Sequence, residues 1–448
     1  MAGNTEAGKT AVGDDTSARG WWLIVAVLGL LVVWQYARVL TITNNHDFAV
    51  YFDAAVDLRE GRDIYADTIP FKAAIEGGTF NYKAEDTIWP YAYTPVVALA
   101  LLPLSYLPYA WAAGLWTALC LLALGLGCWL VLRSQGPITP ARLALALLLL
   151  YGFRPAIVVL RLGQIDVLIF LMVSLAFYWL VKGRDGLAGA VLGLAIAIKF
   201  FSAVLVAYLL WKRRWRPVLW AGVVAALLVI GSYGVVGFDS IPKYLGFTSL
   251  YSSGGFVAYP YHMCFNAFFT RALTDNLFAE PVWGLNLPWL ANGLTLVCSA
   301  VVVVVSAWVT WGRADRDGDR FDLEFGLVLT ALLLVVPPSP LYSYTWLLLP
   351  FIVLGVRMGQ EKRLSLRWPI LLAIAYLMVA RDYRYNIRFV IRFLQSHYLW
   401  GGVVLWATLV AWLRRASTGT VKCGVTATGS DRVTLHRGPV EAGGADDR

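Results

Sequence analysis

The chain has 448 residues, of which 59% are apolar and 15% charged, and its mean hydropathy is +0.64. Soluble domains are usually about 45–50% apolar and about 25% charged, so this composition excludes a soluble globular enzyme and a disordered chain. The five cysteines show no paired spacing, which excludes a disulfide scaffold. The net charge of +9 does not indicate a nucleic-acid partner, because Lys and Arg of membrane proteins gather in cytoplasmic loops.

Apolar runs recur along the chain and predict an all-α polytopic membrane protein with about 9–11 transmembrane helices. Residues 1–20 are polar and are expected to form a disordered cytoplasmic N-terminus before an uncleaved anchor. The membrane domain is expected over 21–413, and the polar tail 414–448 is expected to be disordered in the cytoplasm. The apolar runs after the anchor are 109–132, 141–160, 165–181, 187–211, 217–236, 288–312, 323–337, 341–356, 368–380 and 398–413.

Basic clusters mark the inner ends of most apolar runs and so orient the chain. The long polar segments 41–108, 237–287 and 381–397 then face outside, as do short turns near 161–164 and 338–340. Nine acidic and four basic residues in 41–90 suit that outer side. We therefore expect a multi-pass protein of the plasma (inner) membrane with an active site on its extracytoplasmic face.

Segment 187–211 breaks the alternation, because basic clusters lie at both of its ends and Lys199 lies in its middle. A single span would place an ammonium near mid-bilayer, which is costly. We predict a re-entrant hairpin of two half-helices, too short to cross, with Lys199 at the tip inside an outward-opening cavity. The alternative is one tilted helix with Lys199 paired to a buried acid.

Asp47 opens the first outer segment, a few residues past the anchor, where a carboxylate could remove a proton from a sugar hydroxyl. The alternative is a solvated loop acid. Asp53 and Asp57 are four residues apart, which predicts the exposed face of a surface helix over 47–60.

Two other groups of ionisable residues lie beside apolar runs on the outer side. Arg161 and Asp166 bracket the third outer turn and either face a cavity or pair with each other. One predicted helix face carries Arg381, Arg384, Arg388 and Arg392, which could bind lipid phosphate or rest on anionic headgroups.

Segment 237–287 is aromatic, which suits sugar stacking or a membrane interface; its polar candidates are His262, Asn266 and Arg271. The scattered histidines make no metal set, and no cofactor is expected.

These segments together resemble glycosyltransferase family 87. The stretches HDFAVYFDAAVDLREGRDIY (46–65) and YAYTPVVALALLPLSYLP (91–108) are similar to the opening of that family. LGQIDVLIFLMVSLAFYWL (162–180) and GRDGLAGAVLGLAIAIKFFSAVLVAYLLWKRRW (183–215) carry its most specific pattern: a Gly-Gln turn, an Ala-Gly-x-x-x-Gly entry and a later Lys. The similarity extends over roughly 20–412.

The family includes mycobacterial polyprenol-phosphate-mannose-dependent mannosyltransferases and a related arabinofuranosyltransferase. The resemblance implies a GT-C-type membrane fold, outer loops that form the active site, and a sugar donor carried on a polyprenyl monophosphate. It makes Asp47 the general base. It also puts Lys199 near the donor phosphate, with Arg161, Arg381 and Arg388 as further cations. The expected substrate-binding residues are Tyr51, Tyr93, Gln164, Asp166, His262, Asn266, Tyr342 and Tyr344.

The chain departs from the family pattern at three places. Asp166 stands where Asn commonly follows the Gly-Gln turn. The late Ser-Pro motif, here Ser339-Pro340, lacks the His that follows it in the family, and Tyr342 or Tyr344 is the candidate for its space. The loop motif resembling Asn-Gln-Ser-Leu begins at His262, which could instead supply an imidazole.

The expected function is transfer of mannose, another hexose or arabinofuranose from a polyprenyl-monophosphate donor to a glycolipid or polysaccharide acceptor, among membrane lipids. One alternative is a transporter or flippase of lipid-linked saccharides; the absence of repeated halves in the sequence argues against it. Another is an O-antigen polymerase or ligase that takes a diphosphate-linked donor.

Overall fold

The computed structural model describes residues 7–41, 44–77, 79–80, 89–252, 254–278, 284–311, 319–381 and 396–422. Within these ranges the regular secondary structure is helical, and the one ladder-type contact is an isolated β-bridge between His262 and Pro340. The all-α architecture predicted from composition is thus confirmed.

The first half of the chain builds a surface helix and the central helices. Its elements are α1 (Ala7–Thr41), α2 (His46–Arg59), α3 (Thr68–Glu76), α4 (Pro95–Leu101), η1 (Leu102–Tyr106), α5 (Tyr109–Ser134), α6 (Pro140–Leu150), α7 (Arg154–Leu162), α8 (Asp166–Val181), α9 (Asp185–Ile198), η2 (Phe200–Ser202) and α10 (Ala203–Trp211).

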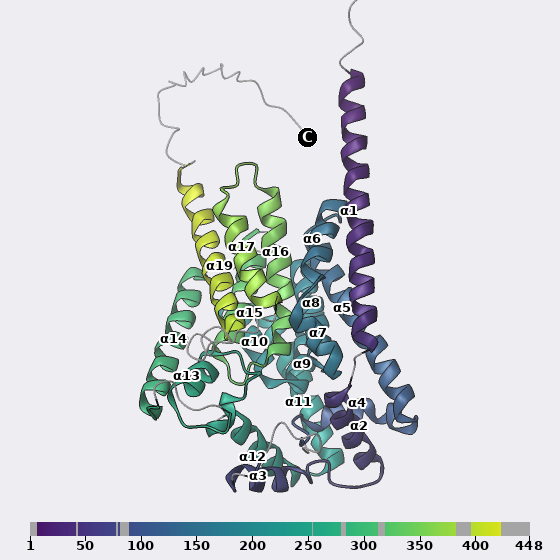
Figure 1. The fold of residues 1–448 in the computed structure, drawn as a ribbon, viewed down its shortest axis with the longest axis vertical. Helices are drawn as coiled ribbons and strands as arrows, with labels where there is room; N and C mark the ends of the chain where they lie inside the picture. The colour runs from purple at the N-terminus through teal and green to yellow at the C-terminus, as the bar shows by residue number, and fades with distance from the viewer. Residues whose placement is uncertain are drawn as a thin grey trace, which may run out of the picture.

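The second half completes the bundle. Its elements are α11 (Trp215–Val236), α12 (Ser240–Ser252), η3 (Gly254–Ala258), α13 (Phe265–Leu273), α14 (Pro288–Val309), α15 (Asp319–Val335), η4 (Leu341–Leu347), α16 (Leu348–Gln360), α17 (Arg367–Ala380) and α19 (His397–Lys422). In Figure 1, α2, α3 and α12 gather at the bottom, opposite the end at which α1 begins.

Helix boundaries differ from the expected ones at both ends of the chain. α1 begins at Ala7, within the segment 1–20, and its apolar part is Arg19–Thr41. α19 continues to Lys422, into the expected tail. Each extension continues a helix into a polar segment, in which every added residue keeps the i to i−4 backbone hydrogen bond.

By length and composition, five described helices could cross a membrane, or six if one bent pair counts as a span. This criterion gives fewer spans than the expected 9–11, because several apolar runs form short helices of 10–17 residues. The run 141–160 is the bent pair: α6 and α7 meet at 62°. Gly152 has a positive φ at the break, and Pro155 opens α7.

The segment around Lys199 forms the predicted hairpin. α9 ends at Ile198, Lys199 has extended backbone angles, and α10 runs back. Asp185, at the start of α9, forms an ion pair with Arg214, just past the end of α10. Since the two ends lie together, the hairpin returns to the side from which it started.

Ion pairs gather at the ends of several helices that carry the basic clusters. Asp322 accepts hydrogen bonds from Arg357 (2.7 Å) and Gln135 (2.8 Å). Glu324 pairs with Lys212 and Arg320, each at 2.7 Å. We call this end of the bundle, marked by these residues and the Asp185–Arg214 pair, the basic end.

Candidate active site

The side chain of Asp47 lies in the first turn of α2, at the end of the bundle opposite the basic end. Its Oδ2 accepts a hydrogen bond of 2.6 Å from Nε2 of Gln164, which lies in the turn between α7 and α8. Gln164 is buried, whereas 22% of the Asp47 side chain is exposed. The carboxylate therefore has one oxygen held by the protein and remains open to an incoming group.

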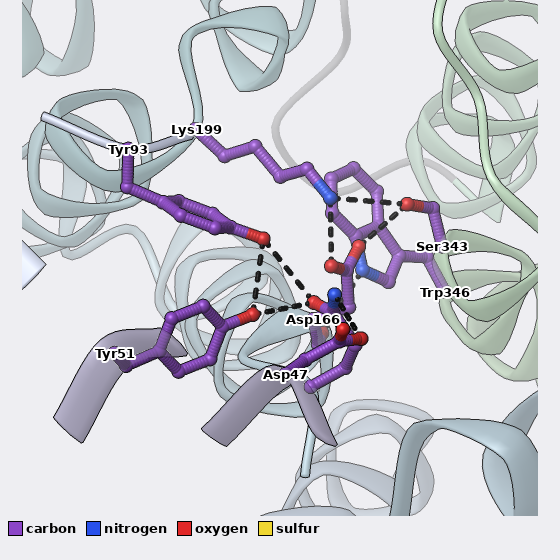
Figure 2. A network of polar contacts seen from close by, with 8 residues as sticks. Asp47, Tyr51, Tyr93, Asp166, Lys199, Ser343 and Trp346 are labelled. Atoms are coloured by element: carbon purple, nitrogen blue, oxygen red, sulfur yellow. Dashed lines mark hydrogen bonds and ion pairs between the residues drawn. The ribbon is translucent and has the colours of Figure 1, made fainter. Parts of the chain in front are cut away.

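Two tyrosine hydroxyls, those of Tyr51 and Tyr93, point toward each other in Figure 2 and both reach the other end of the same amide. Tyr51 and Tyr93 donate to Oε1 of Gln164 at 2.9 and 3.2 Å, and the two hydroxyls are 3.1 Å apart. Tyr51 comes from α2, one turn after Asp47, and Tyr93 precedes α4. Three segments far apart in the sequence thus meet at one amide group.

Asp166 and Lys199 form the second half of the polar network. Lys199 Nζ lies 2.6 Å from Asp166 Oδ2 and 3.3 Å from the hydroxyl of Ser343. Ser343 in turn donates to Asp166 Oδ1 at 2.5 Å, and the indole of Trp346 donates to the Asp166 carbonyl. Figure 2 shows the Lys199 nitrogen between Asp166 and Ser343.

Aromatic rings also surround the Lys199 ammonium. It lies 4.9 Å from the ring centroid of Phe201 and 5.1 Å from that of Tyr342. Such rings attract a cation through their negative faces. The Lys199 side chain is 12% exposed whereas that of Asp166 is fully buried, so an anion entering from outside would reach the lysine first.

The turn that carries Gln164 is fixed against the start of α2. The backbone N–H groups of Asn44 and Asn45 both donate to the carbonyl of Arg161. The indole of Trp116 donates to the carbonyl of Gly163 at 2.7 Å. Gly163 has φ +70°, and a Cβ there would lie 2.8 Å from Cβ of Phe48. The backbone conformation and the close approach both require glycine.

His46 lies on the solvent side of Asp47, with Nδ1 3.4 Å from Oδ1. That hydrogen bond raises the pKa of His46, against the opposing effect of burial. Trp89 makes an edge contact with the imidazole at 6.4 Å between centroids. A protonatable group therefore borders the oxygen of Asp47 that Gln164 leaves free.

The late Ser-Pro motif lies against the segment between η3 and α13. The amide of Met263 donates to Ser339, and that of Leu341 donates to Tyr261. His262 is fully buried there, Nδ1 faces the carbonyl of Val257, and burial lowers the pKa of His262 to about 3. The imidazole is therefore neutral, with Nε2 lacking a hydrogen-bond partner among the described atoms.

The other expected site residues divide between the network and its surroundings. Tyr342 lies in the site, beside Lys199 and within hydrogen-bonding reach of Tyr251. Tyr344 is buried and donates to the carbonyl of Met263, so it anchors the loop. Asn266 accepts from Thr270 within its own helix.

None of the expected phosphate-binding arginines that the structure describes joins the polar network. Arg161 is exposed, and the expected pair with Asp166 is not formed, because Asp166 turns inward to Lys199. Arg381 is exposed, with its guanidinium near Gly152. Arg384, Arg388 and Arg392 lie outside the described residues.

Sequence reasoning missed Ser343 and Trp346, which hold Asp166. The signal was present, because Ser343 lies in the same polar run as Tyr342 and Tyr344, inside an apolar segment. A buried carboxylate needs several donors, and a serine in such a run is a ready one.

The arrangement brings two partly exposed charged side chains, those of Asp47 and Lys199, to one place. Gln164 contacts Asp47, and two residues later Asp166 contacts Lys199. A carboxylate can accept a proton from a hydroxyl, and an ammonium can stabilise charge on a leaving phosphate. Among the described residues, no group of three or more His, Cys, Asp or Glu could hold a metal ion.

Comparison with known proteins gives one family match. The model of glycosyltransferase family 87 matches residues 91–338. The chain is 27% identical over 329 residues to the polyprenol-phosphate-mannose-dependent alpha-(1-2)-phosphatidylinositol pentamannoside mannosyltransferase of Mycobacterium tuberculosis (strain CDC 1551 / Oshkosh), over 72% of this chain and 69% of that protein. It is 25% identical over 364 residues to the alpha-(1->3)-arabinofuranosyltransferase of the same strain, over 77% and 73%.

One solved structure is loosely similar in overall shape. It is that of ArnT from Cupriavidus metallidurans bound to undecaprenyl phosphate, at 17% sequence identity and a TM-score of 0.36, covering 91% of this chain and 79% of that one.

Proposed function

Because the chain belongs to glycosyltransferase family 87, we propose that it transfers a sugar from a polyprenyl-monophosphate donor to a glycolipid or polysaccharide acceptor. The chain is a multi-pass membrane glycosyltransferase. The finer proposal has three parts. The donor is a polyprenyl-monophosphate sugar, the acceptor is a glycolipid or polysaccharide, and the reaction occurs at the extracytoplasmic face of the plasma membrane. Mannose is the first sugar to test, and arabinofuranose the second, because the similar proteins are named for these two sugars.

The observation that carries the proposal is the meeting of Asp47 and Lys199 in one network. In the proposed reaction the acceptor hydroxyl attacks the anomeric carbon of the donor sugar. The bond from that carbon to the phosphate oxygen breaks, and the acceptor proton passes to Asp47. Polyprenyl phosphate leaves while Lys199 stabilises its growing charge. A single displacement inverts the donor carbon.

A lipid-linked donor suits a site at the membrane boundary, because its tail can stay in lipid while its phosphate meets Lys199. The arginines are weaker candidates than Lys199, because the described ones, Arg161 and Arg381, do not join the network. We keep Arg161, Arg381 and Arg388 as second contacts for the donor phosphate, to be tested after Lys199. Tyr342 is the first substrate contact to test, because it lies beside Lys199. The substrate contacts to test after it are His262, Asn266 and Tyr344.

The test replaces Asp47 and measures transfer in nanodiscs from polyprenyl-phosphate mannose. Loss of a general base typically lowers the rate about 100- to 10,000-fold, and we expect Asp47→Asn to fall in that range. Asp53→Asn is the matched control, because Asp53 lies on the same helix on its exposed side. An Asp47→Asn protein with wild-type turnover would remove Asp47 from this role.

A second arm of the same assay separates the donor classes. We expect polyprenyl-monophosphate sugar to support transfer and a diphosphate-linked saccharide to fail. Transfer from the diphosphate alone would indicate a polymerase or ligase. Movement of glycolipid between leaflets without a new glycosidic bond would indicate a transporter.

A further inference from the structure

We propose that Gln164 is a positioning residue for the reaction: its amide fixes the orientation of the Asp47 carboxylate, and Tyr51 and Tyr93 together fix the amide. The inference rests on the proposed function, since it takes Asp47 as the group that receives the acceptor proton. It goes beyond the substrate-binding role expected for these three residues. They act on the base, and the substrate does not have to touch them.

The hydrogen bonds define which way the amide points. Oε1 of Gln164 accepts from two tyrosine hydroxyls at 2.9 and 3.2 Å, so its two lone pairs are both used. Nε2 then points to Asp47 Oδ2 at 2.6 Å. A flipped amide would set its carbonyl oxygen against the carboxylate, and the two would repel each other. Each tyrosine alone suffices to prevent that flip.

The backbone prevents Gln164 from moving away from Asp47. The residue is 5% exposed and follows a glycine in the left-handed conformation. The two amide donors from Asn44 and Asn45 fasten the preceding turn to the start of α2. Gln164 and Asp47 therefore lie on two segments that backbone hydrogen bonds hold together.

The chemical consequence lies in the second oxygen of Asp47. With Oδ2 held by Gln164, the carboxylate cannot rotate freely, and Oδ1 stays directed to the open side where His46 lies. That oxygen is the one available to an acceptor hydroxyl. A displacement of about 1 Å in such a group can reduce the rate about 100-fold.

The first experiment replaces the amide and separates kcat from KM. In Gln164→Leu we expect kcat to fall about 10- to 100-fold while KM for polyprenyl-phosphate mannose changes less than about twofold, because Lys199 keeps its partners. Gln135→Leu is the matched control. Gln135 makes the same amide-to-carboxylate contact with Asp322, at 2.8 Å, but at the basic end. We expect its kcat to match wild type.

The second experiment tests the shared role of the tyrosines and leaves Gln164 in place. Tyr51→Phe and Tyr93→Phe should each lower kcat less than about threefold, because one hydroxyl still holds Oε1. The double variant should lose as much as Gln164→Leu, and so more than the product of the two single losses. The double tyrosine variant also tests the positioning role if Gln164→Leu fails to fold.

The outcomes distinguish this inference from the proposed function. A wild-type kcat in Gln164→Leu, or in the double tyrosine variant, would overturn the positioning role while leaving the reaction intact. An equal loss in kcat and in donor affinity would also overturn it, since that pattern indicates general damage to the site. If the unmodified protein makes no product from polyprenyl-phosphate sugars, the proposed function itself fails.

Discussion

At the scale of single residues, the Asp166–Lys199 pair combines a structural and a functional role. The Asp166 side chain is fully buried, that of Lys199 is 12% exposed, and Nζ lies 2.6 Å from Oδ2. Burying two charges costs solvation free energy that their attraction offsets only with good geometry and further hydrogen bonds. Ser343 donates such a bond to the Asp166 carboxylate, and Trp346 holds the residue through its backbone carbonyl. Either charge left alone would therefore destabilise the fold.

This argument predicts different effects for one and for two substitutions. Lys199→Met should lower the free energy of unfolding by about 3–5 kcal/mol, because Asp166 remains buried without its cation. Lys199→Met combined with Asp166→Asn should recover most of that stability, yet still lack transfer activity. Thermal unfolding in detergent and the nanodisc assay measure the two quantities. Equal stability of the single and double variants would contradict the buried-charge argument.

His46 gives the site a pH dependence. Its pKa is raised above the ordinary value of 6.5 by the hydrogen bond to Asp47. As the pH falls through that raised pKa, the imidazolium forms and binds Asp47 more strongly, so the carboxylate is less available to the acceptor proton. The groups that face His46 in the described structure are Asp47 and Trp89.

We therefore expect wild-type kcat to fall on the acid side as His46 gains its proton. In His46→Asn that fall should move to lower pH, because the side chain at position 46 no longer gains a proton beside Asp47. The pair stabilises the fold below the ordinary pKa of histidine, and this contribution is lost as the pH rises through the raised pKa. Rates measured between about pH 5 and pH 9 check the shift. Identical profiles would exclude His46 from this role.

At the scale of helices, the Ala-Gly-x-x-x-Gly entry has a packing explanation. A Cβ at Gly189 would lie 2.3 Å from the carbonyl oxygen of Pro217, and one at Gly193 would lie 2.6 Å from that of Ala221. Small residues four apart let two helix backbones approach closely. The contact joins α9 to α11 and so holds the arm of the hairpin that leads to Lys199.

Adding one methyl group tests this contact. Gly189→Ala should destabilise the protein by about 1–3 kcal/mol, because backbone atoms must move apart. Gly222→Ala on α11 is the control, since nothing lies within 4 Å of a Cβ there. It should be neutral, or more stable by up to about 1 kcal/mol. Unfolding temperatures of the two variants give the comparison, and equal losses would show that the close approach does not matter.

The same elements show how far sequence reasoning reaches. The hairpin was predictable, because its evidence is local: basic clusters at both ends and Lys199 between them. The partners of Lys199 were not, since Asp166 is 33 residues away and Ser343 is 144 away. Charge pattern offered Arg161 as an equally good partner for Asp166. In the structure Asp166 pairs with Lys199, and Arg161, on the other side of the turn at Gly163, is exposed.

At the scale of the whole molecule, charge and chemistry separate to opposite ends. The basic end gathers ion pairs from α9, α15 and α16, whereas the Asp47 and Lys199 network lies toward α2. Positive charge of this kind is typical of the cytoplasmic side. The proposed sidedness therefore depends on one property of the molecule: the site lies at the end opposite the basic end.

Single cysteines can test that sidedness in intact cells. In a Cys423→Ser background, Glu76→Cys reports on the end near α2 and Lys362→Cys on the basic end; both positions are exposed. A membrane-impermeant maleimide should label position 76 in intact cells, and position 362 only after the cells are permeabilised. The four described native cysteines are buried or half-buried, so the background should be low. The reverse pattern would place the site in the cytoplasm, where nucleotide sugars are made, and the polyprenyl-phosphate donor would lose its main support.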